Sequence, residues 1–384
     1  CVIFAGLFLA AYIVIHMLPQ NVSFTDALHI AGKMDKLNAI DTKFDVNNKY
    51  NLWSGIIGGF FLQLSYFGTD QSQVGRYLTG KSIAQSRLGL VMNGLIKIPM
   101  QFLILLIGVL VFTFYQFHPS PVFFNKVEIS NIENSSYKND YKKLEQAYTV
   151  AYQEKQTEVN KLVEAIHSNN ETLINEARGR VKAADKKSNE IRKEVSALMQ
   201  KNNPKADTND TNYIFLSFIT KELPIGVVGL LIAIIFLASM GSMASGLNSL
   251  ASTTVVDFYK RLFKKEDKSI NYLSVSRWTT VAWGLFCIAV AFYASRVGNL
   301  IEAVNILGSL FYGTILGIFL VAFYMKKVSG TAVFYAAIIA ELFIVYAWIT
   351  DLTAFLWLNV IGCLLVMLFA FVIQSFLNKK QITG

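Results

Sequence analysis

Polar side chains are spread through an otherwise apolar stretch of the chain, residues 53–77. The polar members are Ser54, Gln63, Ser65, Tyr66, Thr69, Asp70, Gln71 and Gln73, and the glycines among them are Gly58, Gly59 and Gly68. Inside a bilayer each polar group needs a protein partner, and glycine allows a helix to unwind or to pack closely. The stretch is therefore predicted to be an interrupted helix whose oxygens line a solute cavity. The alternative is that these groups only hydrogen-bond to neighbouring helices.

A second stretch, residues 236–259, is rich in small and hydroxylated side chains. The hydroxyls belong to Ser239, Ser242, Ser245, Ser249, Ser252, Thr253 and Thr254. Small side chains let helices approach closely, which is a purely structural interpretation. Hydroxyl and carbonyl oxygens are also the ligands of hard cations, so the same residues could hold a sodium ion beside an interrupted helix. Composition leaves both interpretations open.

Three charged residues are candidates because they lie within or at the end of apolar runs. Lys97 belongs to the run near 89–115, Glu302 to the run near 299–324, and Glu341 to the run near 330–350. A charge at membrane depth is costly unless it is paired or solvated, so all three are functional candidates, and for Glu341 a structural pair or a neutral, protonated form is favoured. For Lys97 the alternative is a side chain that extends to the cytoplasmic interface.

The residues needed for covalent or metal chemistry are not arranged for it. The three cysteines are dispersed, and the four histidines have no metal-ligand spacing. This argues against a disulfide framework and a zinc site. The sequence contains neither a nucleophile–base arrangement nor a phosphate-binding loop, so we do not expect an enzyme.

Long apolar runs dominate the 384 residues, of which 53% are hydrophobic and 16% charged. Seven runs are long enough to cross a bilayer as helices. They lie near 53–75, 89–115, 223–250, 278–296, 299–324, 330–350 and 353–377. Residues 1–18 form an eighth apolar stretch without the features of a signal peptide, and it is interpreted as a truncated helix. An all-α, polytopic membrane protein is predicted.

The net charge of +9 is concentrated in alternate loops rather than on one basic face. The basic loops contain Arg76, Lys81 and Arg87; Lys260, Arg261, Lys264, Lys265, Lys268 and Arg277; Lys326 and Lys327; and Lys379 and Lys380. This positive-inside pattern places the basic loops and the C-terminus in the cytoplasm. It accounts for the positive charge without a nucleic-acid partner.

The segment 117–213 is polar and long, and the same pattern places it outside the cytoplasm. Apolar residues at helical spacing predict helices over 138–167 and 171–200, with a turn at residues 167–170. We expect an antiparallel helical hairpin. It is interpreted as a solvated insertion that packs on the protein or a neighbour, with gating or partner binding as the alternative.

The run YFGTDQSQVGRYL, residues 66–78, resembles the hallmark segment of the sodium/solute symporter family. The shared pattern is aromatic-Gly-x-Asp/Asn-Gln-x-x-x-x-Arg-x-Leu, carried here by Gly68, Asp70, Gln71 and Arg76. Gly75 departs from the family, in which glutamine is common at that position. The match is far more specific than a lone glycine motif.

The resemblance implies roles for individual residues. Gln63, Lys97 and Asn305 fall where family members place substrate-contacting side chains, and Tyr66 falls where a tyrosine closes the inner side of the site. Asn305 replaces a glutamine and so provides a shorter amide.

The second stretch resembles the family's sodium-binding helix through Leu247-Asn248-Ser249 and Asp257-Phe258-Tyr259. Aligned in this way, the family's principal sodium ligands fall on Ala238, Gly241 and Ser242, and Ser245 is the candidate for a second sodium. Family members commonly have two adjacent serines where this chain has Gly241 and Ser242. One hydroxyl is thereby lost, which puts the sodium affinity in doubt.

The resemblance further implies an incomplete five-plus-five inverted-repeat transporter fold that begins in its fifth core helix. The expected parts are core helices over 1–116, the hairpin insertion over 117–213, core helices over 214–324, and peripheral helices with a short cytoplasmic tail over 325–384. Because four core helices would precede residue 1, the chain as given is not expected to transport alone.

The implied function is symport of sodium and a small polar solute, a sugar or a carboxylate, across the plasma (inner) membrane. The implied partners are sodium, the solute and the lipid bilayer, without an organic cofactor, and the sequence does not fix the oligomeric state. The alternatives are a proton-coupled transporter, a membrane sensor built on a symporter-like module, and an ion channel.

Overall fold

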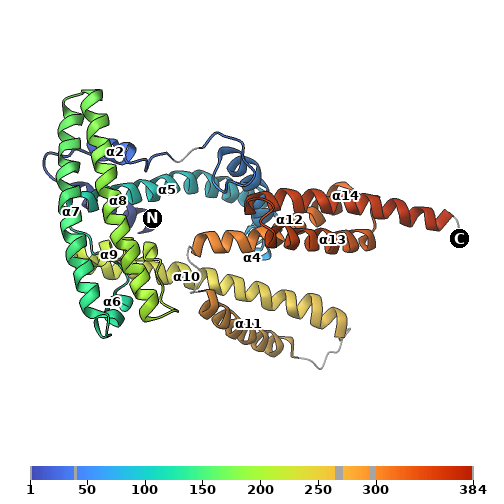
Figure 1. Ribbon diagram of the computed structural model, residues 1–384. Coiled ribbons are helices and arrows are strands. Elements are labelled where there is room, and N and C mark those ends of the chain that lie inside the picture. The colour runs from blue at the N-terminus through green and yellow to red at the C-terminus, as the bar shows by residue number, and fades with distance from the viewer. Residues whose placement is uncertain (1, 39–40, 264–270, 295–299, 383–384) are drawn as a thin grey trace. The chain divides into compact units, whose positions relative to one another are not determined.

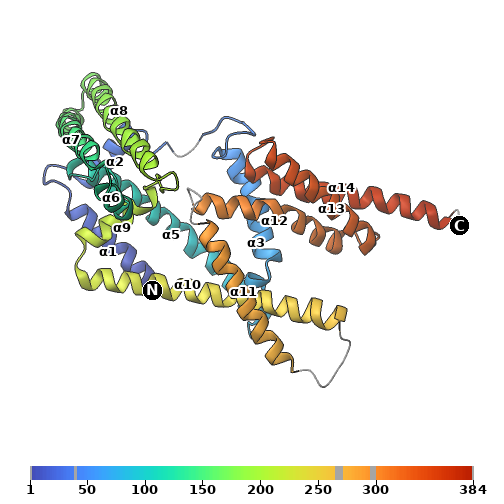
Figure 2. The same ribbon diagram turned by 60° about the horizontal axis from the view of Figure 1, so that its bottom comes forward.

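A computed structural model describes residues 2–38, 41–263, 271–294 and 300–382 (Figures 1 and 2). Over these residues the regular structure is helical, apart from one isolated parallel bridge between Asp41 and Asn51. The chain forms two compact units: residues 1–39 with 93–240, and residues 40–92 with 241–384. The all-α architecture predicted from the sequence is confirmed.

Six helices of the described residues are long and apolar enough to cross a membrane. They are α5 (Ile83–Phe117), α10 (Ile225–Thr253), α11 (Tyr272–Ala294), α12 (Leu300–Tyr324), α13 (Gly330–Ile349) and α14 (Phe355–Ile382). A shorter apolar helix, α1 (Val2–His16), corresponds to the eighth stretch. The remaining run, near 53–75, is divided into shorter helices.

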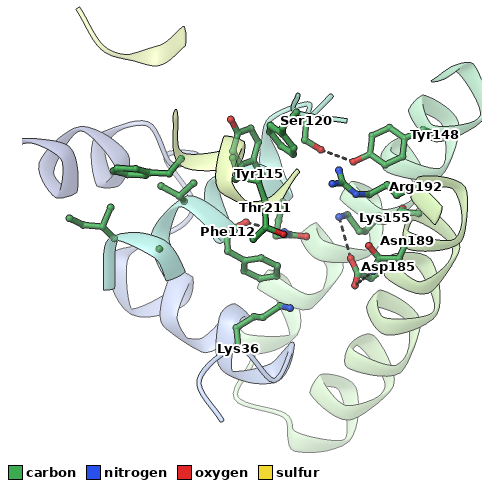
Figure 3. A pocket seen from close by; sticks show the side chains of 18 of the residues that line it. Lys36, Phe112, Tyr115, Ser120, Tyr148, Lys155, Asp185, Asn189, Arg192 and Thr211 are labelled. Atoms are coloured by element: carbon green, nitrogen blue, oxygen red, sulfur yellow. Dashed lines mark hydrogen bonds and ion pairs between the residues drawn. The ribbon is translucent and has the colours of Figure 1, made fainter. Parts of the chain in front are cut away.

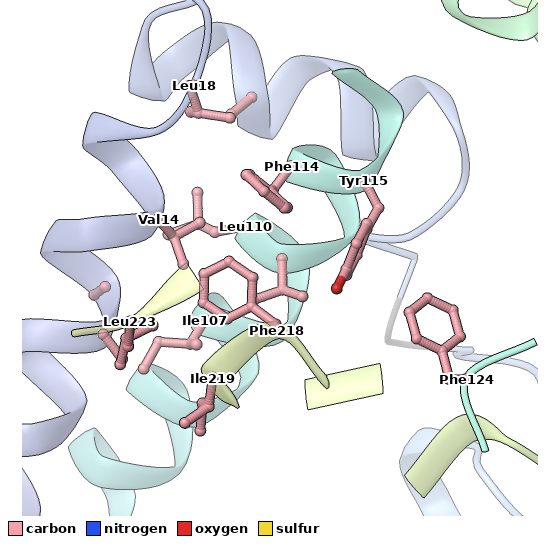
Figure 4. Close-up of a cluster of buried hydrophobic side chains, with 14 residues drawn as sticks. Val14, Leu18, Ile107, Leu110, Phe114, Tyr115, Phe124, Phe218, Ile219 and Leu223 are labelled. Atoms are coloured by element: carbon pink, nitrogen blue, oxygen red, sulfur yellow. The ribbon is translucent and has the colours of Figure 1, made fainter. Parts of the chain in front are cut away.

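The apolar core of the first unit is formed by α1, the C-terminal half of α5, and α9 (Thr211–Glu222). In Figure 4 the side chains of Val14, Leu110 and Phe218 meet between these helices. Each of the three is at most 1% exposed. The burial of large apolar side chains therefore holds these three helices together.

The two predicted helices of the polar segment are present as α7 (Lys138–His167) and α8 (Glu171–Asn202). They lie side by side in both ribbon views (Figures 1 and 2). Asn169 adopts a positive φ of 52°, and Asn170 caps α8 by accepting hydrogen bonds from the backbone N–H groups of Thr172 and Leu173. The short turn is thus built from residues that tolerate left-handed backbone and supply a helix cap.

The hairpin is joined to the rest of its unit through α2 (Phe24–Lys33), which follows a capping box formed by Ser23 and Asp26. Ile30 of α2 is fully buried against the hairpin. The carboxylate of Asp35 pairs with Arg178 at 2.8 Å and with Lys182, and the hydrogen bond from Lys182 is the main cause that lowers the pKa of Asp35. The remaining short helix of this unit is α6 (Lys126–Glu133).

Small residues determine the packing of the second unit. On α13, alanine recurs every fourth residue at Ala332, Ala336 and Ala340, and all three are fully buried. On α12, a β-carbon at Gly313 would lie 2.5 Å from the carbonyl oxygen of Asn359 in α14, and one at Gly317 would lie 2.7 Å from Val366. Gly313 and Gly317 form the Gly-x-x-x-Gly spacing that permits close contact between membrane helices.

The polar stretch 53–77 is interrupted, as the sequence predicts. It consists of a π-helical turn over Ser54–Gly58, then α3 (Gly59–Thr69), then α4 (Gln71–Leu78). The second stretch differs from the expectation. The helix α10 is continuous through Thr253, and only its geometry changes, to a π-helical segment over Thr254–Phe263.

Candidate functional site

The interruption between α3 and α4 is located at Asp70. Its backbone is extended, with φ −71° and ψ 117°, so it ends one helix and caps the next. The Asp70 carboxylate accepts hydrogen bonds from the backbone N–H of Ser72 at 2.8 Å and from the Ser72 hydroxyl at 2.6 Å. This is the geometry of a helix N-cap, which satisfies backbone donors that would otherwise be unpaired.

A second helix holds the same aspartate. The Tyr312 hydroxyl of α12 donates to Asp70 at 3.2 Å, and the Ser65 hydroxyl of α3 donates to the Tyr312 carbonyl at 2.8 Å. Sequence analysis missed Tyr312. A hydroxyl within an apolar run needs a hydrogen-bond partner, and this requirement could have drawn attention to Tyr312. Its partner lies 242 residues away in the sequence, so the pairing itself could not be predicted.

We expect Asp70→Ala to destabilise the start of α4 by about 1–2 kcal/mol, because the cap acceptor is lost. Backbone amides of Ser72 and Gln73, which now donate to Asp70, should exchange hydrogen faster. Asp70→Asn keeps an acceptor and is the matched control. Hydrogen exchange measured by mass spectrometry checks this, and equal protection in both variants would contradict the capping role.

The proposed substrate residues fall in both units. Gln63 and Tyr66 lie on α3, where Gln63 is exposed and Tyr66 is half-buried with its ring 6.3 Å from that of Tyr312. Asn305 lies half-buried on α12, which packs against α3. Lys97 is exposed on α5 and belongs to the first unit. The structure thus brings the helices of three of the four residues together.

Of the remaining motif residues, Arg76 contacts another helix. Arg76 of α4 donates from its Nε to the Ser245 hydroxyl at 3.3 Å, and that hydroxyl donates to the Ser72 carbonyl at 3.4 Å. Gly68 and Gln71 are exposed on either side of Asp70. The motif therefore attaches α4 to α10.

The proposed sodium ligands lie along the continuous helix α10. Ala238 belongs to the first unit, whereas Gly241, Ser242 and Ser245 belong to the second. Gly241 and Ser242 are exposed, and no atom outside the local helix lies within 4 Å of a β-carbon placed at Gly241. Ser245 takes part in the contact between α10 and α4.

A charged contact joins the loop 41–53 to α12. The Lys49 ammonium lies 2.6 Å from Glu302, and this hydrogen bond is the main cause that raises the pKa of Lys49. The same loop meets the start of α14, where the backbone N–H of Ala354 and the Thr353 hydroxyl both donate to the Val46 carbonyl at 2.9 Å. Glu302, a candidate from its position in the sequence, has a definite partner.

The known proteins that this chain resembles are sodium-coupled symporters. Residues 198–340 match the model of the sodium:solute symporter family. The chain is 30% identical over 182 residues to the sodium/sialic acid symporter NanT of Aliivibrio fischeri, covering 45% of this chain and 35% of that protein. It is 33% identical over 127 residues to the sodium/sialic acid symporter SiaT of Proteus mirabilis, covering 32% of this chain and 26% of that protein. The chain thus spans only about a third of the length of these relatives.

A solved structure of a sodium-coupled sialic acid symporter, in a substrate-bound, outward-open state, has a similar fold. The TM-score is 0.64 at 17% identity, and the match covers 98% of this chain and 60% of that one. The six apolar helices define a multi-pass membrane protein, and the relatives that it resembles are transporters. Over residues 198–340 the chain resembles the sodium:solute symporter family.

Proposed function

We propose that the protein of which this chain is part carries out sodium-coupled symport of a small polar organic solute. The observation that carries the proposal is the interrupted α3–α4 segment, whose polar residues contact α12 and α10, in a chain that matches this family over residues 198–340. Its sequence relatives include sodium/sialic acid symporters and a sodium-coupled monocarboxylate transporter. Sialic acid is an acidic sugar, which agrees with a solute of the sugar or carboxylate class.

In this proposal Gln63, Tyr66, Lys97 and Asn305 contact the solute. Amides and a cation suit a ligand with hydroxyl and carboxylate oxygens, since together they offer donors, acceptors and a positive charge. The packing of α3 against α12 supports a shared role for Gln63 and Asn305. A carboxylate would also lower the cost of holding Lys97 at membrane depth.

Sodium would be held by the Ala238 carbonyl, by Gly241, and by the Ser242 hydroxyl, with Ser245 near a second ion. Hard cations bind such oxygens. In a continuous helix the Ala238 carbonyl already accepts a backbone hydrogen bond, but a carbonyl oxygen has a second lone pair.

The mechanism is alternating access within a five-plus-five inverted-repeat fold. Sodium binding favours the outward-open state, the solute binds at the midplane, and both leave inward. In this scheme the core helices lie over 1–116 and 214–324, the hairpin insertion over 117–213, and the peripheral helices over 325–384. The protein spans the plasma (inner) membrane in this proposal. Its C-terminus lies in the cytoplasm, and the hairpin lies on the opposite side of the membrane.

Uptake by vesicles tests the function directly. We expect a labelled acidic sugar or carboxylate to accumulate when an inward sodium gradient is imposed, and the accumulation to vanish when potassium replaces sodium. Accumulation driven equally well by a proton gradient without sodium would favour proton coupling, the alternative motivated by Gly241. Currents without fixed sodium–solute stoichiometry would indicate a channel.

A further inference from the structure

A cavity of about 900 Å³ lies in the first unit, between α5, α9 and the hairpin (Figure 3). One part of its wall is apolar and is formed by residues of the membrane-spanning helix α5, including Ile107 and Val111. The opposite part is polar and is formed by α7 and α8. A guest that fits both walls has an apolar body and a polar head.

The polar wall is positively charged. Among the described lining residues are the cations Lys36, Lys155 and Arg192, and the acidic one is Asp185. Arg192 is neutralised by Asp210, which receives two hydrogen bonds from it at 2.8 and 2.9 Å. The two lysines therefore face the cavity with Asp185 as the one carboxylate among its described lining residues.

Lys155 is the central group of this wall. The residue is only 6% exposed, and its ammonium lies 3.4 Å from Asp185, at the long end of a charged hydrogen bond. Burial lowers the pKa of Lys155, and Asp185 only partly opposes this. In Figure 3 Lys155 lies beside Asp185 and Arg192 and points toward the side of the cavity formed by Phe112 and Thr211. A second anion would stabilise the buried ammonium.

Two further features indicate what the head must contain. The Lys36 ammonium lies 5.1 Å from the ring centre of Phe112, so an aromatic face supports this cation at the cavity wall. Gln116 is 3% exposed and donates to the Phe112 carbonyl at 2.9 Å, whereas its Oε1 has no hydrogen-bond partner within the described part of the chain. A buried amide oxygen of this kind calls for a donor such as a hydroxyl.

We propose that this cavity binds an amphipathic anion, with the anionic head on Lys155 and Lys36, a hydroxyl on Gln116, and the apolar body along α5. Two sources have this chemistry: an anionic lipid headgroup with its chains, and a soluble carboxylate with an apolar tail. The site is separate from the transport residues, so it stands or falls independently of the proposed symport.

Binding of radiolabelled 3-hydroxydecanoate to the full-length protein in phosphatidylcholine nanodiscs tests the proposal. Lys155→Met should weaken binding about tenfold, because a charge-assisted hydrogen bond is lost. Asp185→Asn should tighten it severalfold, because the competing carboxylate is removed. The matched control is Lys186→Met. Lys186 is an exposed residue of α8 that does not line the cavity, so this variant should bind the probe as tightly as the parent does.

The opposite signs distinguish a binding site from a structural ion pair. If Lys155 and Asp185 only stabilise the hairpin, both substitutions break the same pair and shift binding in the same direction, or not at all, and the proposal is overturned. Should Lys155→Met fail to fold, Asp185→Asn decides alone: tighter binding supports the site, and unchanged or weaker binding overturns it. Failure of the probe to bind the parent protein also overturns it.

The two sources are separated by repeating the measurement in phosphatidylglycerol nanodiscs. If phosphatidylglycerol weakens binding of the probe to the parent protein, but not the residual binding to Lys155→Met, the cavity binds the lipid headgroup. Equal binding in both bilayers assigns it to the soluble carboxylate. Both results keep the anion site.

Discussion

Replacing Ser242 with alanine should raise the sodium concentration for half-maximal uptake at least about tenfold. Loss of groups that merely orient a metal ligand already costs about 10–100-fold in affinity, so loss of a ligand oxygen should cost no less. The effect should be large here because Gly241 offers no hydroxyl to compensate. Sodium-dependent uptake into vesicles at saturating solute measures it.

Ser239→Ala is the matched control for this variant. Ser239 lies on the same helix, and its hydroxyl donates to the Phe236 carbonyl at 2.9 Å, as an ordinary intrahelical bond. Its sodium dependence should equal that of the parent. A Ser242→Ala protein with the parent's sodium dependence would remove Ser242 from the cation site and leave the packing interpretation of this stretch.

Gly313→Val should strongly destabilise the packing of α12 against α14. A β-carbon at this position would lie 2.5 Å from the carbonyl oxygen and 2.7 Å from the Cα of Asn359, which are backbone atoms and cannot move alone. Forcing atoms into a packed contact costs about 3 kcal/mol, which corresponds to a loss of roughly 10 °C in the midpoint of thermal unfolding. Thermal unfolding of the protein in detergent measures the loss.

The matched control is Gly284→Val on α11, where no atom outside the local helix lies within 4 Å of the added β-carbon. It changes the same residue type in a membrane-spanning helix of the same unit, so it reports the cost of the substitution without the clash. Equal midpoints for the two variants would show that α12 and α14 are not packed this closely.

Local patterns were sufficient to predict several elements from the sequence. The hairpin follows from helical spacing on either side of the turn at Asn169 and Asn170, and α7 and α8 begin at the predicted residues. The interruption at Asp70 follows from polar residues and glycine in an apolar run. Each of these signals depends on neighbours within a few turns of the chain.

Other features depend on contacts between distant segments, and the sequence alone does not reveal them. Glycine and hydroxyl residues in 236–259 suggested an interrupted helix, but α10 continues through Thr253, because such residues also suit close packing. Tyr312 escaped notice because its partner is on another helix. The sodium and solute residues remain predictions, since their roles depend on contacts with a bound ion and solute.

The contacts of the loop 41–53 with α12 and α14 of its own unit differ in their sensitivity to salt. Its backbone bonds to the start of α14 at Ala354 are neutral and insensitive to salt. The Lys49–Glu302 pair is half-exposed at Lys49, so it is worth no more than about 1 kcal/mol and is screened over roughly 8 Å at physiological ionic strength. Rising salt should therefore weaken the contact of the loop with α12 and leave its hydrogen bonds to the start of α14 unchanged.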